Sequence, residues 1–429
     1  MNVEKFEVIV VGGGLAGSAA AYTLAKAGVK VAVIERGESC GCKNMTGGRL
    51  YGHSLKKLIP DYEKTAPLER KITKERVTFM SKGAATTLEF SNKTLGGRNA
   101  ASYSVIRADF DKWLAKEAEK QGAFYINGIR VDELVVRNGK VCGIRAGEDT
   151  LEANVVILAD GVNSLLAKKA GLIKEQDPME YAVGAKEVIK LGADRIHERF
   201  GTEGNDGTAW MFAGEPTGGG SGGGFIYTNR DTLSVGIVAT VGDIGYADES
   251  IVKMLDNFKA NPLIAPLVEG GELVEYSAHL VPEGGIRMMP RLYDHGVMIA
   301  GDAAGMVMNL GYVVRGMDLA IESGRIAAET YIEVRARHDF TPEALSLYRK
   351  KLEKSFVLKE MRRHRTAPKA FSNRNVFTKL PVLAENAMNA MFTVDGENTA
   401  GLVWKIIGAA KKYGFGSLMK DILQLLRAA

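Results

Sequence analysis

A run of glycines near the N-terminus joins an apolar run to a helix-like segment. Residues 12–17 read GGGLAG; they follow the apolar, β-branched run 6–11 and precede a small-residue helix predicted over residues 18–27. Residues 29–34 then predict a second strand. A strand, a G-x-G-x-x-G turn, a helix and a second strand within about 30 residues form the βαβ unit that binds dinucleotides. The N-terminal part of the chain is therefore predicted to be a Rossmann-like α/β domain.

Three glycines of this turn have separate structural roles. Gly12 permits the tight turn, Gly14 lets the backbone approach a pyrophosphate, and Gly17 lets the helix pack closely on the strand. The helix N-terminus adds N–H donors and a positive dipole. Glu35 ends the second strand and would accept hydrogen bonds from an adenosine ribose but repel a 2′-phosphate, which favours NAD or FAD over NADP. The residues expected to contact the dinucleotide here are Gly12, Gly14, Leu15, Ala16, Gly17, Glu35 and Arg36.

A second G-x-G-x-x-G match, at Gly218, Gly220 and Gly223, lacks this context. It follows Pro216 and precedes the strand-like residues 225–228, with no helix to receive a phosphate. We interpret it as a flexible loop. The chain is therefore predicted to have one dinucleotide site, which argues against a reductase with separate flavin and nicotinamide folds.

Length and composition predict a globular chain of two to three domains. The 429 residues are 46% hydrophobic and 25% charged, which excludes disordered and fibrous classes. Cys40, Cys42 and Cys142 are too few for a disulfide framework, and residues 1–5 lead into a strand without a signal peptide. No stretch has the roughly 20 apolar residues that cross a bilayer. We therefore expect a cytoplasmic protein that at most touches a membrane.

The basic charge is concentrated in the last part of the chain. Residues 331–429 contain 18 Lys and Arg against nine Asp and Glu, whereas residues 1–330 contain 38 against 42. A solvated helical face is the ordinary explanation. The alternative is an anionic partner or an anionic lipid surface.

Two further turns follow apolar strands later in the chain. Residues 155–159 (VVILA) end in DGVNS, after a hairpin predicted at Asn138-Gly139, and residues 297–300 (VMIA) end in GDAAG. Residues 104–114 (SVIRADFDKWL) predict an amphipathic helix that follows an arginine.

Together with the first turn, these blocks resemble the FAD-dependent fold of aromatic hydroxylases, geranylgeranyl reductases and electron transfer flavoprotein:quinone oxidoreductases, and most of all its FixC branch. The resemblance spans nearly the whole chain, and residues 299–321 (IAGDAAGMVMNLGYVVRGMDLAI) are its most specific part. It is also carried by KNMTGGRLYGHSL (43–55), SVIRADFD (104–111), ILADGVNS (157–164), GGGFIYTN (222–229) and EYSAHLVPEGG (275–285).

The resemblance implies a single FAD, extended with its pyrophosphate on the first helix. Asp302 would bond a ribityl hydroxyl and Arg107 would reach the ribityl-phosphate region. A helix opening near residues 309–311 would direct its N–H groups at the pyrimidine end of the flavin. Taken alone, Asp302 also fits a helix N-cap and Arg107 a surface ion pair. The other residues implied at the FAD are Asn44, Gly47, Gly48, Val131, Ala159, Asp160, Gly161, Gly301, Asn309, Leu310 and Gly311.

The fold class that follows is α/β, with three parts. A Rossmann-like FAD-binding domain is interleaved with an antiparallel β-sheet substrate domain, and a basic helical region follows for docking a partner or a membrane. The predicted boundaries are 1–75, 104–177 and 287–335 for the FAD-binding domain, 76–103 and 178–286 for the quinone or substrate domain, and 336–429 for the helical region.

The FixC branch takes electrons from an electron transfer flavoprotein and passes them to a membrane quinone. Mitochondrial relatives bind a four-iron cluster through cysteines near the C-terminus, but here the last cysteine is Cys142 and a cluster needs about four thiolates, so no metal site is expected. The resemblance implies instead a separate ferredoxin-like iron–sulfur subunit and a two-chain electron transfer flavoprotein. Their complex would oxidise NADH and split the electrons between quinone and a low-potential ferredoxin or flavodoxin. This chain would serve the quinone at the inner face of the cell membrane, with no nucleic acid partner.

The catalytic residue is not identified by any motif. His53, Tyr227 and His279 fall within or beside the family blocks and are candidates to line the quinone or relay protons, with ordinary core roles as the alternative. Cys40 and Cys42 are candidates for a redox role, for metal binding or for filling space. Metal binding lacks further ligands nearby, and a C-x-C disulfide would be strained.

The C-terminal residues carry the membrane prediction. Residues 346–365 predict a long basic helix, and residues 401–412 form an amphipathic segment of the kind that lies at a lipid interface. A helical layer packed on the substrate domain or on a partner is the alternative. The apolar residues near one face are Leu402, Val403, Ile406 and Ile407, flanked by Trp404 and three lysines.

Other functions share these blocks. A geranylgeranyl reductase usually shows an aromatic-Trp-x-Phe-Pro segment, whereas residues 209–216 read AWMFAGEP. A flavin monooxygenase and a structural subunit whose FAD never turns over are the further alternatives.

Overall fold

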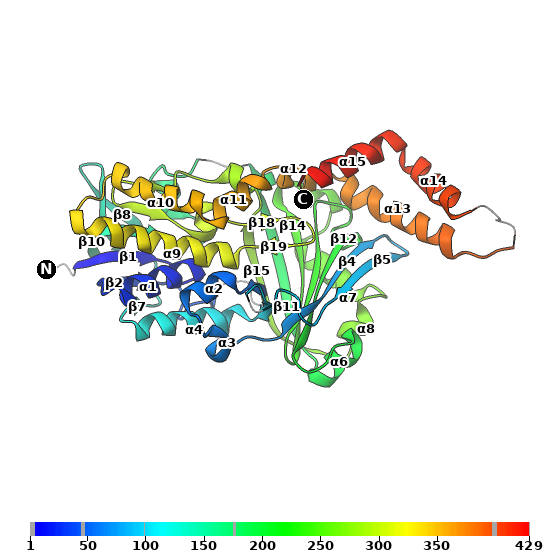
Figure 1. Cartoon of the computed structure of the whole chain (residues 1–429), viewed down its shortest axis with the longest axis horizontal. Coiled ribbons are helices and arrows are strands. Elements are labelled where there is room, and N and C mark those ends of the chain that lie inside the picture. The colour runs from blue at the N-terminus through cyan, green and yellow to red at the C-terminus, as the bar shows by residue number, and fades with distance from the viewer. Residues whose placement is uncertain (1–4, 44–47, 98, 175–176, 397–400, 429) are drawn as a thin grey trace.

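The computed structural model describes residues 5–43, 48–97, 99–174, 177–396 and 401–428. A layered α/β unit contains the N-terminal strands, a large sheet adjoins it, and helices of the C-terminal region project from the far side of that sheet (Figure 1). This arrangement agrees with the predicted α/β class and helical C-terminal region.

The first sheet has a parallel core, as the βαβ pattern predicts. The central strands are buried because their apolar residues are covered on both faces. An antiparallel hairpin, turning at Asn138 and Gly139 as predicted, pairs with the edge of β10. The strands of the main path are β16 (Tyr293–Asp294), β17 (Val297–Ile299), β10 (Asp149–Leu158), β1 (Lys5–Val11), β2 (Val31–Ile34) and β7 (Phe124–Ile126), in this order, and the hairpin is β8 (Glu133–Arg137) with β9 (Lys140–Ala146).

Helices cover both faces of this sheet (Figure 1). The predicted first helix begins earlier than expected, at Leu15, because the glycine turn leads directly into it. Small side chains on α1 let α9 cross close above it. The helices around this sheet are α1 (Leu15–Lys26), α2 (His53–Leu58), α3 (Tyr62–Thr65), α4 (Arg107–Lys120), α5 (Leu165–Lys169), α9 (Met317–Val334) and α10 (Pro342–Lys354).

The second sheet is antiparallel except where β12 pairs in parallel with β4. Its helices α6 (Ala193–Phe200), α7 (Ile251–Ala260) and α8 (Ala265–Val268) lie beside one face. The described strands are β15 (Glu272–Pro282), β11 (Tyr181–Lys190), β14 (Thr232–Thr240), β13 (Gly222–Thr228), β12 (Asp206–Gly214), β4 (Lys71–Met80), β6 (Ser102–Val105) and β3 (Gly48–Tyr51), in this order, with β5 (Ala85–Ser91) on the edge of β4.

The strands do not follow the predicted domain boundaries closely. β4 crosses the boundary placed after residue 75, and β3, which falls in a segment assigned to the FAD-binding domain, pairs in the second sheet. The division into domains therefore stays a prediction.

The flexible loop predicted at the second glycine motif is wrong in its second half. Gly222 and Gly223 belong to β13. A Cβ on Gly223 would lie 2.2 Å from the carbonyl oxygen of Phe212, so this strand needs a glycine to approach its neighbour.

The C-terminal region differs from its prediction at Ser355. The long basic helix is interrupted there, because the Ser355 hydroxyl accepts the N–H of Val357 at 3.2 Å and caps a new helix. Arg374 pairs with the buried Asp243 and so anchors the region to the second sheet. None of the described helices is both long enough and apolar enough to cross a membrane. The remaining helices are α11 (Phe356–Arg363), α12 (Ala367–Phe371), α13 (Asn375–Phe392), α14 (Leu402–Tyr413) and α15 (Phe415–Ala428).

Candidate functional site

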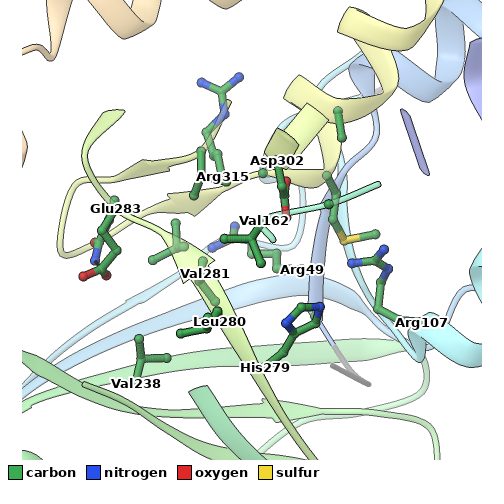
Figure 2. A pocket seen from close by; sticks show the side chains of 18 of the residues that line it. Arg49, Arg107, Val162, Val238, His279, Leu280, Val281, Glu283, Asp302 and Arg315 are labelled. Atoms are coloured by element: carbon green, nitrogen blue, oxygen red, sulfur yellow. Dashed lines mark hydrogen bonds between the residues drawn. The ribbon is translucent and has the colours of Figure 1, made fainter. Parts of the chain in front are cut away.

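One cavity of about 710 Å³ is lined by the glycine turn, by strands of both sheets and by the C-terminal helices. Arg107 and His279 lie toward one end in Figure 2, and Glu283 lies toward the other. Most of the residues that the sequence assigned to FAD line it: Gly12, Gly14, Leu15, Ala16, Glu35, Arg36, Gly48, Arg107, Val131, Ala159, Asp160, Gly161, Asp302, Asn309, Leu310 and Gly311.

Two assigned glycines lie behind the cavity wall and are not among its lining residues. A Cβ on Gly17 would lie 1.9 Å from the carbonyl oxygen of Gly12, so Gly17 serves the close packing of helix on strand. The N–H of Gly301 donates to Ser323 Oγ at 3.0 Å. Asn44 and Gly47 fall outside the described residues.

The glycine turn leaves the start of α1 open to the cavity. Gly12 has φ +99°, and a Cβ there would lie 2.3 Å from the carbonyl oxygen of Ala159. Gly14 is the N-cap, and no side chain in the described part of the chain caps the helix. Unpaired N–H groups of a first helical turn and the helix dipole together suit a pyrophosphate.

Glu35 is oriented by backbone donors. Its Oε2 accepts the N–H of Gly13 at 2.8 Å and its Oε1 accepts the N–H of Gly37 at 2.6 Å. Because a carboxylate has about four lone-pair sites, each oxygen can still accept a ribose hydroxyl.

Arg107 and Asp302 lie on the same cavity. Asp111 accepts two hydrogen bonds from the guanidinium of Arg107, at 2.7 and 2.8 Å. Burial raises the pKa of Asp302, and the positive charge of Arg107 opposes that rise. The pair therefore offers both a cation and an acceptor to a bound group.

Asp160 has an unused acceptor. Burial raises the pKa of Asp160 to about 6, although backbone hydrogen bonds oppose the rise. Its Oδ1 is buried and has no partner in the described part of the chain. Because a buried acceptor without a hydrogen bond costs about 1–3 kcal/mol of stability, we expect a bound molecule to donate a hydrogen bond to it. The donors and acceptors of this end thus fit an extended dinucleotide, with N–H groups for phosphate and carboxylates for hydroxyls.

The helix expected near residues 309–311 begins later. Met308–Asn309 (β18) pairs with Val314–Arg315 (β19), and Gly311, with φ +77°, donates its N–H to Asn309 Oδ1 at 2.9 Å. This small hairpin excludes helix, and α9 starts at Met317 without a side-chain cap. Gly316 and Met317 line the cavity, so the N-terminus of α9 opens onto it. This helix begins a few residues later than the one predicted near residues 309–311.

His53 is not among the residues that line the cavity. Its Nε2 lies 3.4 Å from Asp318 Oδ2, and its ring meets the edge of Phe356 with centroids 4.8 Å apart. Burial lowers the pKa of His53, and Asp318 opposes the change. These contacts are those of a structural histidine.

Tyr227 and His279 do line the cavity. Burial raises the pKa of Tyr227, whose hydroxyl contacts Met211 Sδ at 3.9 Å. Burial lowers the pKa of His279, and the charges of Arg36 and Arg107 lower it further. His279 therefore belongs to the nucleotide end of the cavity.

The cysteine pair is divided by burial. Cys40 is buried beneath the glycine turn, and a Cβ on Gly13 would lie 2.4 Å from its sulfur. Burial raises the pKa of the Cys40 thiol, and the charge of Glu35 adds to the rise. A thiol that stays protonated is a poor nucleophile, which supports the space-filling interpretation for Cys40. Cys42 is exposed.

Sequence reasoning missed several charged residues on the cavity, among them Arg49, Arg315 and Glu283. Arg49 pairs with Glu75, and its guanidinium lies 4.6 Å from the centre of the Tyr51 ring. The missed residues stand in strands and turns where single charges follow no periodic pattern. The one available signal was that Arg49, Glu283 and Arg315 each belong to a family block, at 43–55, 275–285 and 299–321.

The remaining wall of the cavity is apolar. It extends from β12 of the second sheet to the C-terminal helices α12, α13 and α15. Its apolar residues include Met211, Phe212, Phe371, Val376, Phe377, Leu425 and Leu426.

Two family models match the chain. The ETF-QO/FixC family C-terminal domain matches residues 367–429, and glucose inhibited division protein A matches residues 7–177. The two matches fall on the C-terminal helices and on the segment that carries the glycine turn.

Curated relatives match along nearly their whole length. The probable electron transfer flavoprotein-quinone oxidoreductase YdiS of Escherichia coli (strain K12) is 50% identical over 98% of both chains. The FixC protein of Salmonella typhimurium (strain LT2) is 49% identical over 99% of both.

Solved structures share the fold at lower identity. A geranylgeranyl bacteriochlorophyll reductase-like protein from Thermoplasma acidophilum has a TM-score of 0.73 and 22% identity, over 99% of this chain and 100% of the other. The flavin-dependent brominase Bmp2 has a TM-score of 0.64 and 17% identity, over 99% and 94% of the two chains. Identity near 50% to the curated relatives identifies the family of the chain much more narrowly than the shared fold does. With its open glycine turn and its matching C-terminal domain, the chain is therefore an FAD-dependent oxidoreductase that belongs to the ETF-QO/FixC family.

Proposed function

We propose that this chain takes electrons from an electron transfer flavoprotein through FAD and reduces a membrane quinone. The observation that carries the proposal is the continuity of the cavity: it begins at the glycine turn and ends in an apolar wall beside the C-terminal helices. The name of the Escherichia coli relative, a probable electron transfer flavoprotein-quinone oxidoreductase, agrees with it.

FAD supplies the chemistry of accepting two electrons and passing them on. The N-terminus of α1 would hold its pyrophosphate, Glu35 its adenosine ribose, and Arg107 with Asp302 its ribityl-phosphate region. The N-terminus of α9 would face the pyrimidine end, where negative charge accumulates on reduction. Residues on these elements thus orient the cofactor and favour its reduced form.

A lipid-soluble substrate would enter from the C-terminal side. Leu425 and Leu426 of α15 line the cavity, while Val403 and Trp404 of the neighbouring α14 are 66% and 69% exposed. An exposed valine and tryptophan beside lysines suit the interface of an anionic membrane. Leu402 and Ile406, predicted to share this face, have side chains outside the described set.

The electron donor in this proposal is a protein. A nicotinamide would need a second site, and the second glycine motif lies partly in a strand. By the resemblance to FixC, the donor is a two-chain electron transfer flavoprotein in a complex that also contains a ferredoxin-like iron–sulfur subunit. That complex would bifurcate electrons from NADH at the inner face of the cell membrane.

The test compares two electron donors on the same protein. The full chain with FAD is mixed with anionic vesicles that contain a quinone, and then with either reduced electron transfer flavoprotein or NADH. We expect rapid quinol formation with the protein donor and slow formation with NADH alone. Rapid quinone reduction with NADH alone would contradict the proposal that the electron donor is a protein. A flavin that is reduced but never passes electrons to quinone would contradict the proposal that quinone is the acceptor.

A further inference from the structure

Glu283 is a carboxylic acid on the cavity wall, just past the end of β15. Its Oε1 accepts a hydrogen bond from Asn309 Nδ2 at 3.2 Å, and its Oε2 accepts one from Thr240 Oγ1 at 3.1 Å. Asn309 is a residue assigned to the flavin, and Thr240 ends β14, which is separated from β15 by β11 in the sheet. Two elements that are distant in sequence therefore hold this carboxyl in one orientation.

The environment of Glu283 favours the protonated acid. No cation pairs with it within the part of the chain that the structure describes. Burial raises the pKa of Glu283, and the hydrogen bonds from Asn309 and Thr240 only oppose this rise. Because a threonine hydroxyl both donates and accepts, the contact with Thr240 serves the acid as well as the carboxylate.

Two other titratable residues on the cavity, His279 and Tyr227, are poorer donors at this end. His279 lies near Arg36 and Arg107, whereas Glu283 lies toward the other end of the cavity (Figure 2). Tyr227 has a raised pKa and is directed at a methionine sulfur. Glu283 is instead bonded to Asn309, whose neighbour Gly311 lies against Phe371 of the apolar wall. It thus lies between the part assigned to the flavin and the apolar part assigned to the substrate.

We propose that Glu283 is the acid that protonates the quinone reduced in this cavity. The inference rests on the proposed function. Quinone becomes quinol by gaining two electrons and two protons; both electrons and one proton come from the singly anionic reduced flavin, and the second proton comes from the Glu283 carboxyl. Oxidised FAD and the Glu283 carboxylate remain, and the carboxylate regains its proton from water. Asn309 and Thr240 are positioning residues that orient the acid.

The test separates proton delivery from electron delivery. The full chain with FAD is reduced chemically and mixed in a stopped-flow instrument with either a short-tailed quinone or ferricenium, which takes electrons without protons. Glu283→Gln keeps the shape of the side chain and removes the acid. Glu272→Gln is the matched control, because Glu272 lies exposed at the start of β15, the strand that leads to Glu283. Infrared difference spectra record, independently of turnover, whether a protonated carboxyl changes its band when the flavin is oxidised.

We expect Glu283→Gln to slow flavin reoxidation by quinone about 100-fold, the scale of general acid catalysis, and to leave reoxidation by ferricenium unchanged. The carboxyl band should be absent in this variant and present in Glu272→Gln. Equal rates with quinone, or equal slowing with both acceptors, would overturn the role of Glu283 while the proposed function stands. If the unmodified chain reduces ferricenium but no quinone, the proposed function itself fails, and this inference fails with it.

Discussion

Arg107 and Asp111 form a two-point ion pair across one turn of α4, with N–O distances of 2.7 and 2.8 Å. Asp111 is fully buried, whereas Arg107 lines the cavity. The buried carboxylate therefore orients the guanidinium before any ligand arrives, and the arginine does not have to be ordered on binding.

Asp111→Asn should weaken FAD binding although Asp111 itself is not among the residues lining the cavity. Loss of a hydrogen bond between charged groups costs about 1.5–3 kcal/mol, so the FAD dissociation constant should rise at least about tenfold. Fluorescence titration of the flavin-free chain measures it. Asp109→Asn is the control, because Asp109 is exposed on the same helix. Unchanged affinity in Asp111→Asn would mean that Arg107 does not contact the cofactor.

Substitutions at two glycines of the first turn should have different effects on FAD binding and on stability. Gly14 has φ −71°, which any residue adopts, so Gly14→Val should fold and yet lose FAD because its side chain occupies the pyrophosphate position. Gly12 has φ +99° and no room for a Cβ, so Gly12→Ala should lose stability as well. Thermal melting and flavin absorbance of the two purified variants distinguish these outcomes. Retention of FAD by Gly14→Val would contradict the assigned phosphate position.

His53 should make the fold sensitive to acid. Its folded pKa lies below the ordinary value of 6.5, mainly because of burial, so the unfolded chain binds more protons than the folded one as the pH falls through about 6.5. The contribution of the neutral His53 to the free energy of unfolding is therefore fully present above that pH, and it is lost as the pH falls further. His53→Gln should lose less stability than the unmodified chain between about pH 7.5 and pH 5, as measured by urea unfolding. His338→Gln, at an exposed histidine, should leave the acid loss unchanged.

The C-terminal helices should bind anionic vesicles. Replacing Lys405, Lys411 and Lys412 by glutamate should reduce binding at low salt at least about 100-fold, because each lysine near an anionic surface contributes about 1 kcal/mol. Trp404→Asp should reduce binding at any salt concentration, since the loss of apolar contact is not screened. Vesicle sedimentation measures both, with FAD absorbance as the check of folding.

The control for the vesicle experiment is Leu263→Asp. Leu263 is 52% exposed and lies two residues before α8, on a different part of the molecule from α14 (Figure 1). If Leu263→Asp weakened binding as much as Trp404→Asp, lipid would not be docking through the C-terminal helices.

Local pattern was sufficient for the cofactor end of the site. Gly12, Gly17 and Glu35 lie within one βαβ unit, where each residue's role follows from the turn, the helix and the strand that contain it. The hairpin at Asn138-Gly139 was predictable for the same reason, since both residues need positive φ. The start of the helix at Met317 was not, because the pairing of β18 with β19 competes with helix over the preceding residues.

The placement of Glu283 at the other end of the cavity depends on the tertiary structure. Glu283 and Asn309 are 26 residues apart, and Thr240 is 43 residues before Glu283, so no local periodicity relates them. Sequence and resemblance determined that this chain binds FAD and belongs to its family. Only the packing of the two sheets and the C-terminal helices decided which charges are buried beside that cofactor, because burial depends on neighbours that are distant along the chain.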